Sequence, residues 1–294
     1  MASNDNADFK LYRYTPSLVA AIIFLVLFVF LTFYHLYQVV RTRCWYFTVF
    51  VVGGTFQIIG YICRALAHDD KESIPIYSVG TIMILLAPPL YAASIYMTLG
   101  RLIMHLDAEG LSMVPVKWLT AIFVTGDVIA FVMQAAGGGI MASGTISAMT
   151  TGEHITIGGL AVQLVFFSIF IATSAIFHGR IRNNPTENAV TPSPLSTVLH
   201  TNTWETIMTG LYVSSILILI RSIFRLIEYA QGNDGYLISH EVFMYVFDSM
   251  LMFFTMVVMS IFHPSKVLSR STKSQRASRK SYLSNTELLP TGEV

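Results

Sequence analysis

Seven long apolar segments dominate this chain, and they leave few folds open to it. Their approximate cores, in order along the chain, are Ser17–Val40, Trp45–Leu66, Ile76–Leu99, Val116–Ala136, Ile155–Phe177, Glu205–Ile227 and Val242–Phe262. Each is close to the ~20 residues that an α-helix needs to cross a bilayer. Strands of a membrane barrel would be about ten residues long with alternating polarity, whereas these segments are longer and continuously apolar. The sequence therefore predicts an all-α polytopic membrane protein, a bundle of seven transmembrane helices.

The composition agrees with a membrane location. The mean hydropathy is +0.61, 54% of the 294 residues are hydrophobic and only 12% are charged. Soluble domains carry about twice that proportion of charged residues. We therefore expect the partners to be membrane lipids and an amphiphilic small molecule, and we expect no nucleic acid. The sequence leaves the oligomeric state open.

The basic residues predict which way the segments cross. If the segments are threaded alternately, 12 of the 18 Lys and Arg residues fall on one side of the membrane. These are Arg41, Arg43, Arg101, Lys117, Arg180, Arg182 and the six from Lys266 to Lys280. Only Lys10, Arg13 and Lys71 fall on the other side. Because basic residues favour cytoplasmic loops, the N-terminus is predicted outside and the C-terminus in the cytoplasm.

The chain divides into a predicted helical domain and two polar tails. Residues 1–16 are expected to form an extracellular tail, 17–264 the seven-helix domain, and 265–294 a disordered, basic and serine-rich cytoplasmic tail. The proline-containing loop 179–204 is expected to be flexible. The glycine-rich outer loop 137–154 carries almost no charge, so it either folds over the outer mouth of the bundle or serves as a mobile linker.

Polar residues recur inside four of the predicted spans at helical spacing. An ionisable group near the centre of a span costs ~2.5–3.5 kcal/mol on insertion scales, so it is expected to be paired, solvated or functional. The four stripes are Gln57, Tyr61 and Arg64; Asp127 and Gln134; Arg221, Arg225 and Glu228; and Glu241, Tyr245 and Asp248. Separations of three, four or seven residues place the members of each stripe on one helix face. We expect these faces to converge on a polar, ligand-binding chamber in the outer half of the bundle.

The charges of this group do not balance, since three arginines face four carboxylates. The surplus acid suits an amine-bearing ligand, a proton, or no ligand. Asp127, near the midplane, and Asp248, about two turns below the outer rim, are the deepest acids and the sharpest candidates. Either could be protonated at that depth. The alternative is that the residues form ion pairs that hold the helices together, which we favour for Arg225 with Glu228.

Two further features carry weaker signals. Pro88 and Pro89 lie midway along the third segment, where proline predicts a kink that is either a hinge or purely architectural. The cytoplasmic histidines could in principle hold a hydrolytic zinc. They are His35, His105, His178, His200 and His263. The histidines expected outside are His68, His154 and His240, of which one could ligate haem. No H-E-x-x-H spacing supports a metal site, so we expect no metal and no cofactor.

Three stretches carry a resemblance to a known family. They are Leu85–Ile103, Gly126–Gly139 and Arg221–Gly235, the last followed by Glu241, Tyr245 and Asp248. With them the chain resembles the fungal lipid-translocating exporter family, seven-span proteins linked to toxin resistance and lipid-base export. Pro89 stands where this family is expected to have a small residue, which leaves the local kink open.

The resemblance implies a protein of a fungal plasma membrane that handles an amphiphile. Family members are associated with sphingoid long-chain bases, with aminosterol resistance, or with haem and porphyrin. The motif positions that it carries over are Arg64, Asp127, Gln134, Arg221, Arg225, Glu228, Glu241 and Asp248.

We therefore expect a transporter that moves an amphiphile between leaflets or out of the cell. The first alternative is a seven-helix sensor or receptor that binds a lipid, a porphyrin or haem, and the second is a zinc-dependent membrane lipid hydrolase. There is no P-loop motif and no G-x-S-x-G elbow, so an enzyme is not expected.

Overall fold

The computed structural model describes residues 17–68, 73–141, 146–190, 203–232 and 235–265, and all regular structure in these ranges is helical. Seven helical segments are long and apolar enough to cross a membrane, as predicted. Six of them are α1 (Leu18–Thr42), α2 (Thr48–Leu66), α3 (Ile74–His105), α4 (Val116–Met141), α5 (Ile146–Asn183) and α8 (Thr203–Ala230). The seventh joins α10 (Glu241–Met244), the π-helical η3 (Tyr245–Ser249) and α11 (Met250–Ile261). The connections contain η1 (Trp45–Phe47), η2 (Glu109–Leu111), α6 (Glu187–Val190) and α9 (Tyr236–Ser239).

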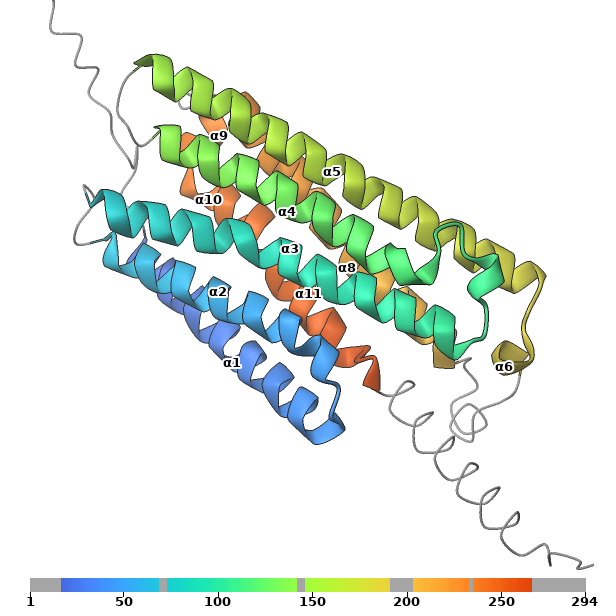
Figure 1. Ribbon diagram of the computed structural model, residues 1–294. Coiled ribbons are helices and arrows are strands. Elements are labelled where there is room, and N and C mark those ends of the chain that lie inside the picture. Colours follow the sequence, from blue (N-terminus) through green and yellow to red (C-terminus); the bar gives the residue numbers. More distant parts are fainter. Residues whose placement is uncertain (1–16, 69–72, 142–145, 191–202, 233–234, 266–294) are drawn as a thin grey trace, which may run out of the picture.

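The spans form a bundle in which helices adjacent in sequence pack side by side (Figure 1). The ring closes because α8 packs on α11 and α11 packs on α1. Helix α3 also contacts α8 across the ring, so it occupies the centre. Of its apolar stretch 67% is buried, against 28% for α1, whose exposed apolar face suits contact with acyl chains.

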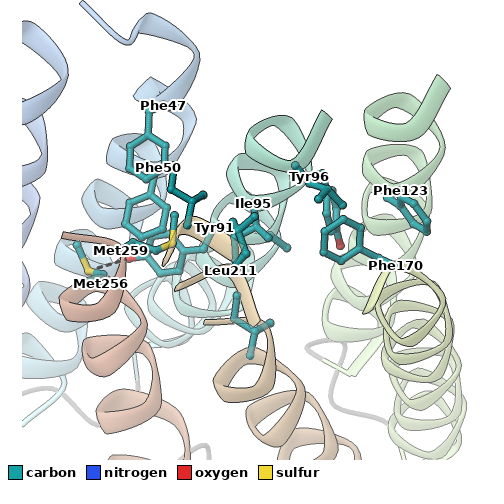
Figure 2. Close-up of a cluster of buried hydrophobic side chains, with 14 of the residues drawn as sticks. Phe47, Phe50, Tyr91, Ile95, Tyr96, Phe123, Phe170, Leu211, Met256 and Met259 are labelled. Carbon is teal, nitrogen blue, oxygen red and sulfur yellow. Dashed lines mark hydrogen bonds between the residues drawn. The ribbon is translucent and has the colours of Figure 1, made fainter. Parts of the chain in front are cut away.

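Aromatic rings and methionines fill the space around α3 (Figure 2). The Tyr91 ring lies 4.5 Å from that of Phe50 on α2, and its hydroxyl donates to Met256 Sδ on α11 at 3.3 Å. On the opposite side, the Tyr96 ring lies 4.4 Å from Phe170 of α5. Large aromatic side chains contribute most of the buried area in such a core. Tyr91 and Tyr96, five residues apart on α3, thus anchor this helix to neighbours on both sides.

Glycine allows two helix pairs to approach closely. A Cβ atom at Gly53 of α2 would lie 2.8 Å from the Tyr91 ring, and one at Gly126 of α4 would lie 2.5 Å from the Phe166 ring of α5. Contacts this short leave no room for a methyl group. Small residues serve this purpose widely in membrane bundles.

Two spans contain a feature that interrupts the regular α-helical hydrogen-bond pattern. Pro88 and Pro89 lie inside α3, which nevertheless continues as helix from Ile74 to His105. In the seventh span the backbone forms the π-helical η3, where Ser249 Oγ donates to the Met244 carbonyl oxygen at 3.4 Å. Single π-helical turns occur often at functional sites.

The prediction of a loop over residues 137–154 is wrong. Helix α4 continues to Met141 and α5 begins at Ile146, so only residues 142–145, which lie outside the described residues, remain for a lid or linker. Gly137, Gly138 and Gly139 belong to α4, and a Cβ atom at Gly137 would lie 2.5 Å from the Gly152 carbonyl oxygen of α5. Residues 1–16, 191–202 and 266–294, which include most of both predicted tails and part of the predicted flexible loop, also lie outside the described residues.

Candidate functional site

Arg221 is the most deeply placed of the predicted arginines, with 1% of its surface exposed. From α8 its Nε donates to Asp248 Oδ1 on η3. Its Nη2 donates to the Ile84 carbonyl oxygen of α3 at 3.4 Å. Ile84 lies four residues before Pro88, which has no N–H to offer this carbonyl. One guanidinium therefore ties together three spans and satisfies the acceptor that the proline leaves free.

A second ion pair joins the end of α2 to the start of the seventh span. Arg64 Nη2 donates to Glu241 Oε1 at 2.9 Å, and Arg64 Nε donates to the Tyr245 hydroxyl at 3.2 Å. The Glu241 carboxylate also accepts the backbone N–H of Ser17, at 3.0 Å to Oε1 and 2.9 Å to Oε2. Ser17 is the N-cap of α1, so this carboxylate fixes the first turn of α1 against α2.

The third pair lies within one helix. Arg225 Nη1 donates to Glu228 Oε2 at 2.7 Å, and Arg225 Nη2 donates to the Tyr229 hydroxyl at 3.4 Å. The three residues share a face of α8, as their spacing predicts. The ion pair predicted between Arg225 and Glu228 is therefore present. It lies one turn beyond Arg221 on α8.

Tyr61 and Gln57 of α2 lie beside these pairs. The Tyr61 hydroxyl forms a hydrogen bond with Ser249 Oγ of η3, and the Tyr61 ring stacks on Phe28 of α1 with centroids 5.2 Å apart. Gln57 is 1% exposed, and its Oε1 has no hydrogen-bond partner among the described residues. The polar face of α2 is thus buried along its whole length.

Asp127 and Gln134 of α4 find their partners elsewhere. The Tyr96 hydroxyl of α3 donates to Asp127 Oδ2 at 3.0 Å, while Oδ1 has no hydrogen-bond partner among the described residues. Gln134 Nε2 donates to Gln163 Oε1 of α5 at 3.0 Å. The prediction that all four stripes share one group is therefore wrong for α4. Its stripe faces α3 and α5, and the other three stripes meet among α2, α8 and the seventh span.

The structure also identifies the surplus acid of the charge count. Each arginine of the predicted group is paired with one carboxylate, in the three pairs above. Asp127 is the acid left over, and it has no ion pair with any described residue. It is 3% exposed, so it is enclosed in protein.

Several partners at the site were not predicted. They are Ser17, the Ile84 carbonyl, Tyr96, Gln163 and Ser249. Gln163 was detectable as an amide within an apolar span, and the freed carbonyl follows from counting four residues back from Pro88. Tyr96 gave no signal, because a tyrosine among apolar residues is ordinary in a membrane core.

The histidines are used in packing and hydrogen bonding. The His35 Nε2 lies 3.0 Å from the Met256 carbonyl oxygen, and the His35 ring lies 6.4 Å from that of His263. His178 stacks on Tyr212 of α8 at 5.6 Å. Within the described ranges no three His, Cys, Asp or Glu side chains gather as a metal site would require. The described residues thus offer no zinc site for the hydrolase alternative. One of its candidate ligands, His200, lies outside the described residues.

Six apolar spans around the central span α3, with ion pairs enclosed among them, define a multi-pass membrane protein with a polar interior. Residues 50–271 match the family described as RTA1 like protein. The chain belongs to this family, as its resemblance to lipid-translocating exporters implied.

Several fungal relatives match over most of the chain. It is 35% identical to Protein RTM1 of Saccharomyces cerevisiae, over 87% of this chain and 93% of that protein. It is 32% identical to Protoporphyrin uptake protein 1 of the same organism, over 88% and 93% of the two chains. No solved structure matches.

Two relatives carry names that state transport of a lipid. The chain is 31% identical to Probable lipid transporter atnI of Emericella nidulans, over 92% of this chain and 72% of that one. It is 28% identical to Sphingoid long-chain base transporter RSB1 of Saccharomyces cerevisiae, over 85% and 72%.

Proposed function

We propose that this protein is a transporter that moves a cationic amphiphile, such as a sphingoid long-chain base, between leaflets or out of the cell. The names of the two lipid-transporting relatives support the class of cargo. Asp127 is the observation on which the proposal rests. Its enclosed carboxyl group has no cationic partner among the described residues, and ionisable groups inside a span are costly and mark functional sites.

The predicted site residues take different roles in this proposal. Asp127 and Asp248 are the deep acids that accept a cationic head group or a coupling proton. Asp248 already contacts Arg221, and its Oδ2 has no hydrogen-bond partner among the described residues, so it retains acceptor capacity. Arg221 and Arg225 hold the neighbouring carboxylates and any acidic group of the cargo. The apolar tail leaves between helices into the lipid.

The remaining residues complete the binding region. Gln57, Tyr61 and Tyr245 supply hydroxyl and amide groups beside the arginines, and Gln134 does so on α4. Arg64, Glu228 and Glu241 keep the region closed through the ion pairs described above. These residues form polar surfaces that a head group could contact once the helices separate.

The proposed orientation places the start of α1 and the junction of α4 with α5 outside the cell. It follows from the excess of Lys and Arg in the opposite loops and in the C-terminal tail. In this orientation Arg64 and Glu241 lie near the outer face. The fungal relatives and the amphiphilic cargo favour the plasma membrane as the location.

A porphyrin is the second candidate cargo, because Protoporphyrin uptake protein 1 is among the relatives. A porphyrin is a large apolar ring with acidic side chains, which arginine recognises well. The same bundle could bind either ligand as a sensor that does not move it.

Reconstitution distinguishes these possibilities. The purified full chain is placed in liposomes, and the flux of a fluorescently labelled sphinganine is compared with that of liposomes without protein. Binding of the same probe is measured on the purified protein. Flux above the protein-free rate is the expected result. Binding without flux would identify a sensor, and neither binding nor flux would reject the sphingoid base as cargo. Protoporphyrin is then the next probe.

A further inference from the structure

We propose that the Asp127 carboxyl is the proton-binding group of a proton-coupled cycle and that the head group of the cargo binds elsewhere. The inference rests on the proposed transport function and names its coupling ion. In one state Asp127 gains a proton and becomes a neutral carboxylic acid. In the other state it returns that proton to the opposite side of the membrane.

The space around Asp127 favours a proton over an amine. Directly before it, a Cβ atom at Gly126 would lie 2.5 Å from the Phe166 ring of α5. One turn later, a Cβ atom at Gly159 of α5 would lie 2.7 Å from the Ala130 carbonyl oxygen of α4. The two helices are therefore tightly packed on both sides of the acid, against a side-chain ring at Gly126 and against backbone at Gly159. An alkylammonium group carries three donors and a chain of carbons, whereas a proton needs only one oxygen atom.

The groups that face Asp127 do not compensate a charge. From α3, the titratable neighbour is Tyr96, which donates its hydroxyl hydrogen. Its ring packs on those of Phe123 and Phe170, at 5.5 and 4.4 Å between centroids. From α5 the Phe166 ring packs against Gly126, the residue before Asp127, and no described Lys, Arg or His pairs with the acid. An uncompensated carboxylate in such surroundings is strongly disfavoured, so this packing stabilises the protonated form.

Polar side chains lead away from Asp127 along the interface between α4 and α5. Gln134 lies seven residues further on the same face, about 10 Å along the helix axis. It is hydrogen-bonded to Gln163 of α5, and Thr156 lies seven residues before Gln163 on that helix. Thr156 is buried against Gly137 of α4. Amides and hydroxyls both donate and accept hydrogen bonds, so this file of side chains suits a proton better than a bulkier cation.

The proton site is separate from the three ion pairs. Asp127 and its partners belong to α3, α4 and α5, and the paired charges belong to α2, α8 and the seventh span. A proton at Asp127 therefore changes the net charge of one part of the bundle without breaking a pair in the other. This separation allows the acid to titrate while the pairs keep the helices assembled.

A flux experiment with an imposed pH difference tests the coupling. The full chain in liposomes is given labelled sphinganine with a pH difference of about one unit, which can drive about tenfold accumulation if one proton exchanges for one cationic molecule. We expect the wild type to accumulate the probe, and Asp127→Asn to equilibrate it without accumulation. Asp107→Asn, the same change at an exposed loop residue, is expected to accumulate it like the wild type.

Three results of this experiment would overturn the inference. Accumulation by Asp127→Asn, or equilibration without accumulation by the wild type, would show that Asp127 does not carry a coupling proton. Either result would still be consistent with transport. Loss of both binding and equilibration in a folded Asp127→Asn variant would assign the head group to Asp127 instead. Circular dichroism of each variant checks that the helices are intact.

A second measurement does not depend on the probe. Infrared spectra of the purified wild type and of Asp127→Asn are subtracted at a series of pH values. We expect a protonated carboxyl band in the difference that disappears as the pH rises, and we expect Tyr96→Phe to shift its frequency because the hydroxyl donor is lost. A difference spectrum without any titrating band would reject the proton site even if the wild type does not move sphinganine. Failure of flux with a titrating band would count against the proposed cargo alone.

Discussion

The Arg221 guanidinium donates to the main-chain carbonyl oxygen of Ile84, the carbonyl that Pro88 leaves without its helix partner. The same side chain donates to Asp248 in the π-helical turn of the seventh span. Arg221 thus joins the irregular points of two spans across the centre of the bundle. A proline and a π-helical turn are both common causes of kinks in helices.

This junction predicts an energetic coupling between Pro88 and Arg221. Arg221→Met leaves Asp248 buried without its cation, and it is expected to destabilise the protein by about 3–5 kcal/mol. In the Pro88→Ala background the backbone N–H of residue 88 donates to the Ile84 carbonyl oxygen. The loss of stability caused by Arg221→Met is therefore expected to be smaller by about 1 kcal/mol. Thermal unfolding in detergent of the two single variants and the double variant measures the coupling.

Pro89→Ala is the matched control for that coupling. It restores the N–H one residue too late to reach Ile84, so its coupling to Arg221→Met is expected to be near zero. Equal coupling for both prolines would mean that the Arg221 bond to Ile84 contributes nothing specific.

The close contact of α4 with α5 predicts a position-dependent response to alanine. At Gly126 the added Cβ would lie 2.5 Å from the Phe166 ring, and we expect a loss of about 1–3 kcal/mol from overpacking. At Gly138, on the same helix, nothing lies within 4 Å of the added atom, so Gly138→Ala is expected to be neutral or up to about 1 kcal/mol stabilising. Similar losses at both positions in a thermal unfolding assay would contradict the packing.

The Glu241 carboxylate predicts a local change at the other end of the chain. In Glu241→Gln one carboxylate oxygen becomes an NH2 group, so the bonds to the Ser17 N–H and to Arg64 are weakened. Faster hydrogen exchange is expected over the first turn of α1, corresponding to a loss of about 1–3 kcal/mol for a charge-assisted bond. Glu109→Gln, at an exposed position in η2, is the control and should leave that exchange unchanged. Unchanged protection of α1 in Glu241→Gln would show that the carboxylate does not hold it.

The proposed orientation predicts which loops a membrane-impermeant thiol reagent can reach. Tyr236 is 63% exposed at one end of the bundle, and Gly110 lies in η2 at the other end. In a chain without Cys44 and Cys63, Tyr236→Cys is expected to be labelled in intact cells, and Gly110→Cys only after the membrane is permeabilised. The reverse pattern would invert the topology.

Sequence reasoning located the spans because their signal is long and strong. It placed the helix ends less well, since α5 runs from Ile146 to Asn183 and the predicted core was Ile155–Phe177. Polar and glycine residues at the membrane edge continue the helix when a neighbouring helix packs on them. Gly137 against Gly152 is such a contact, and the sequence contains no information about which helix will lie opposite.

The site was predicted in part for a similar reason. Helical spacing correctly grouped Arg221 with Arg225 and Glu228 on one face, but spacing within a helix does not give the direction of that face. The polar stripe of α4 was therefore predicted to join the other three stripes, whereas it faces α3 and α5. The charge count, which needs no geometry, correctly left one carboxylate over, and the structure identifies it as Asp127.

The central claim is that the unpaired acid is the working carboxyl of an amphiphile transporter. The most direct measurement is the steady-state level of labelled sphinganine in fungal cells that lack their own exporters and express wild type, Asp127→Asn or Asp107→Asn at equal surface amounts. We predict a low level with wild type and Asp107→Asn, and with Asp127→Asn the high level of cells without the protein. A low level with Asp127→Asn would contradict the claim.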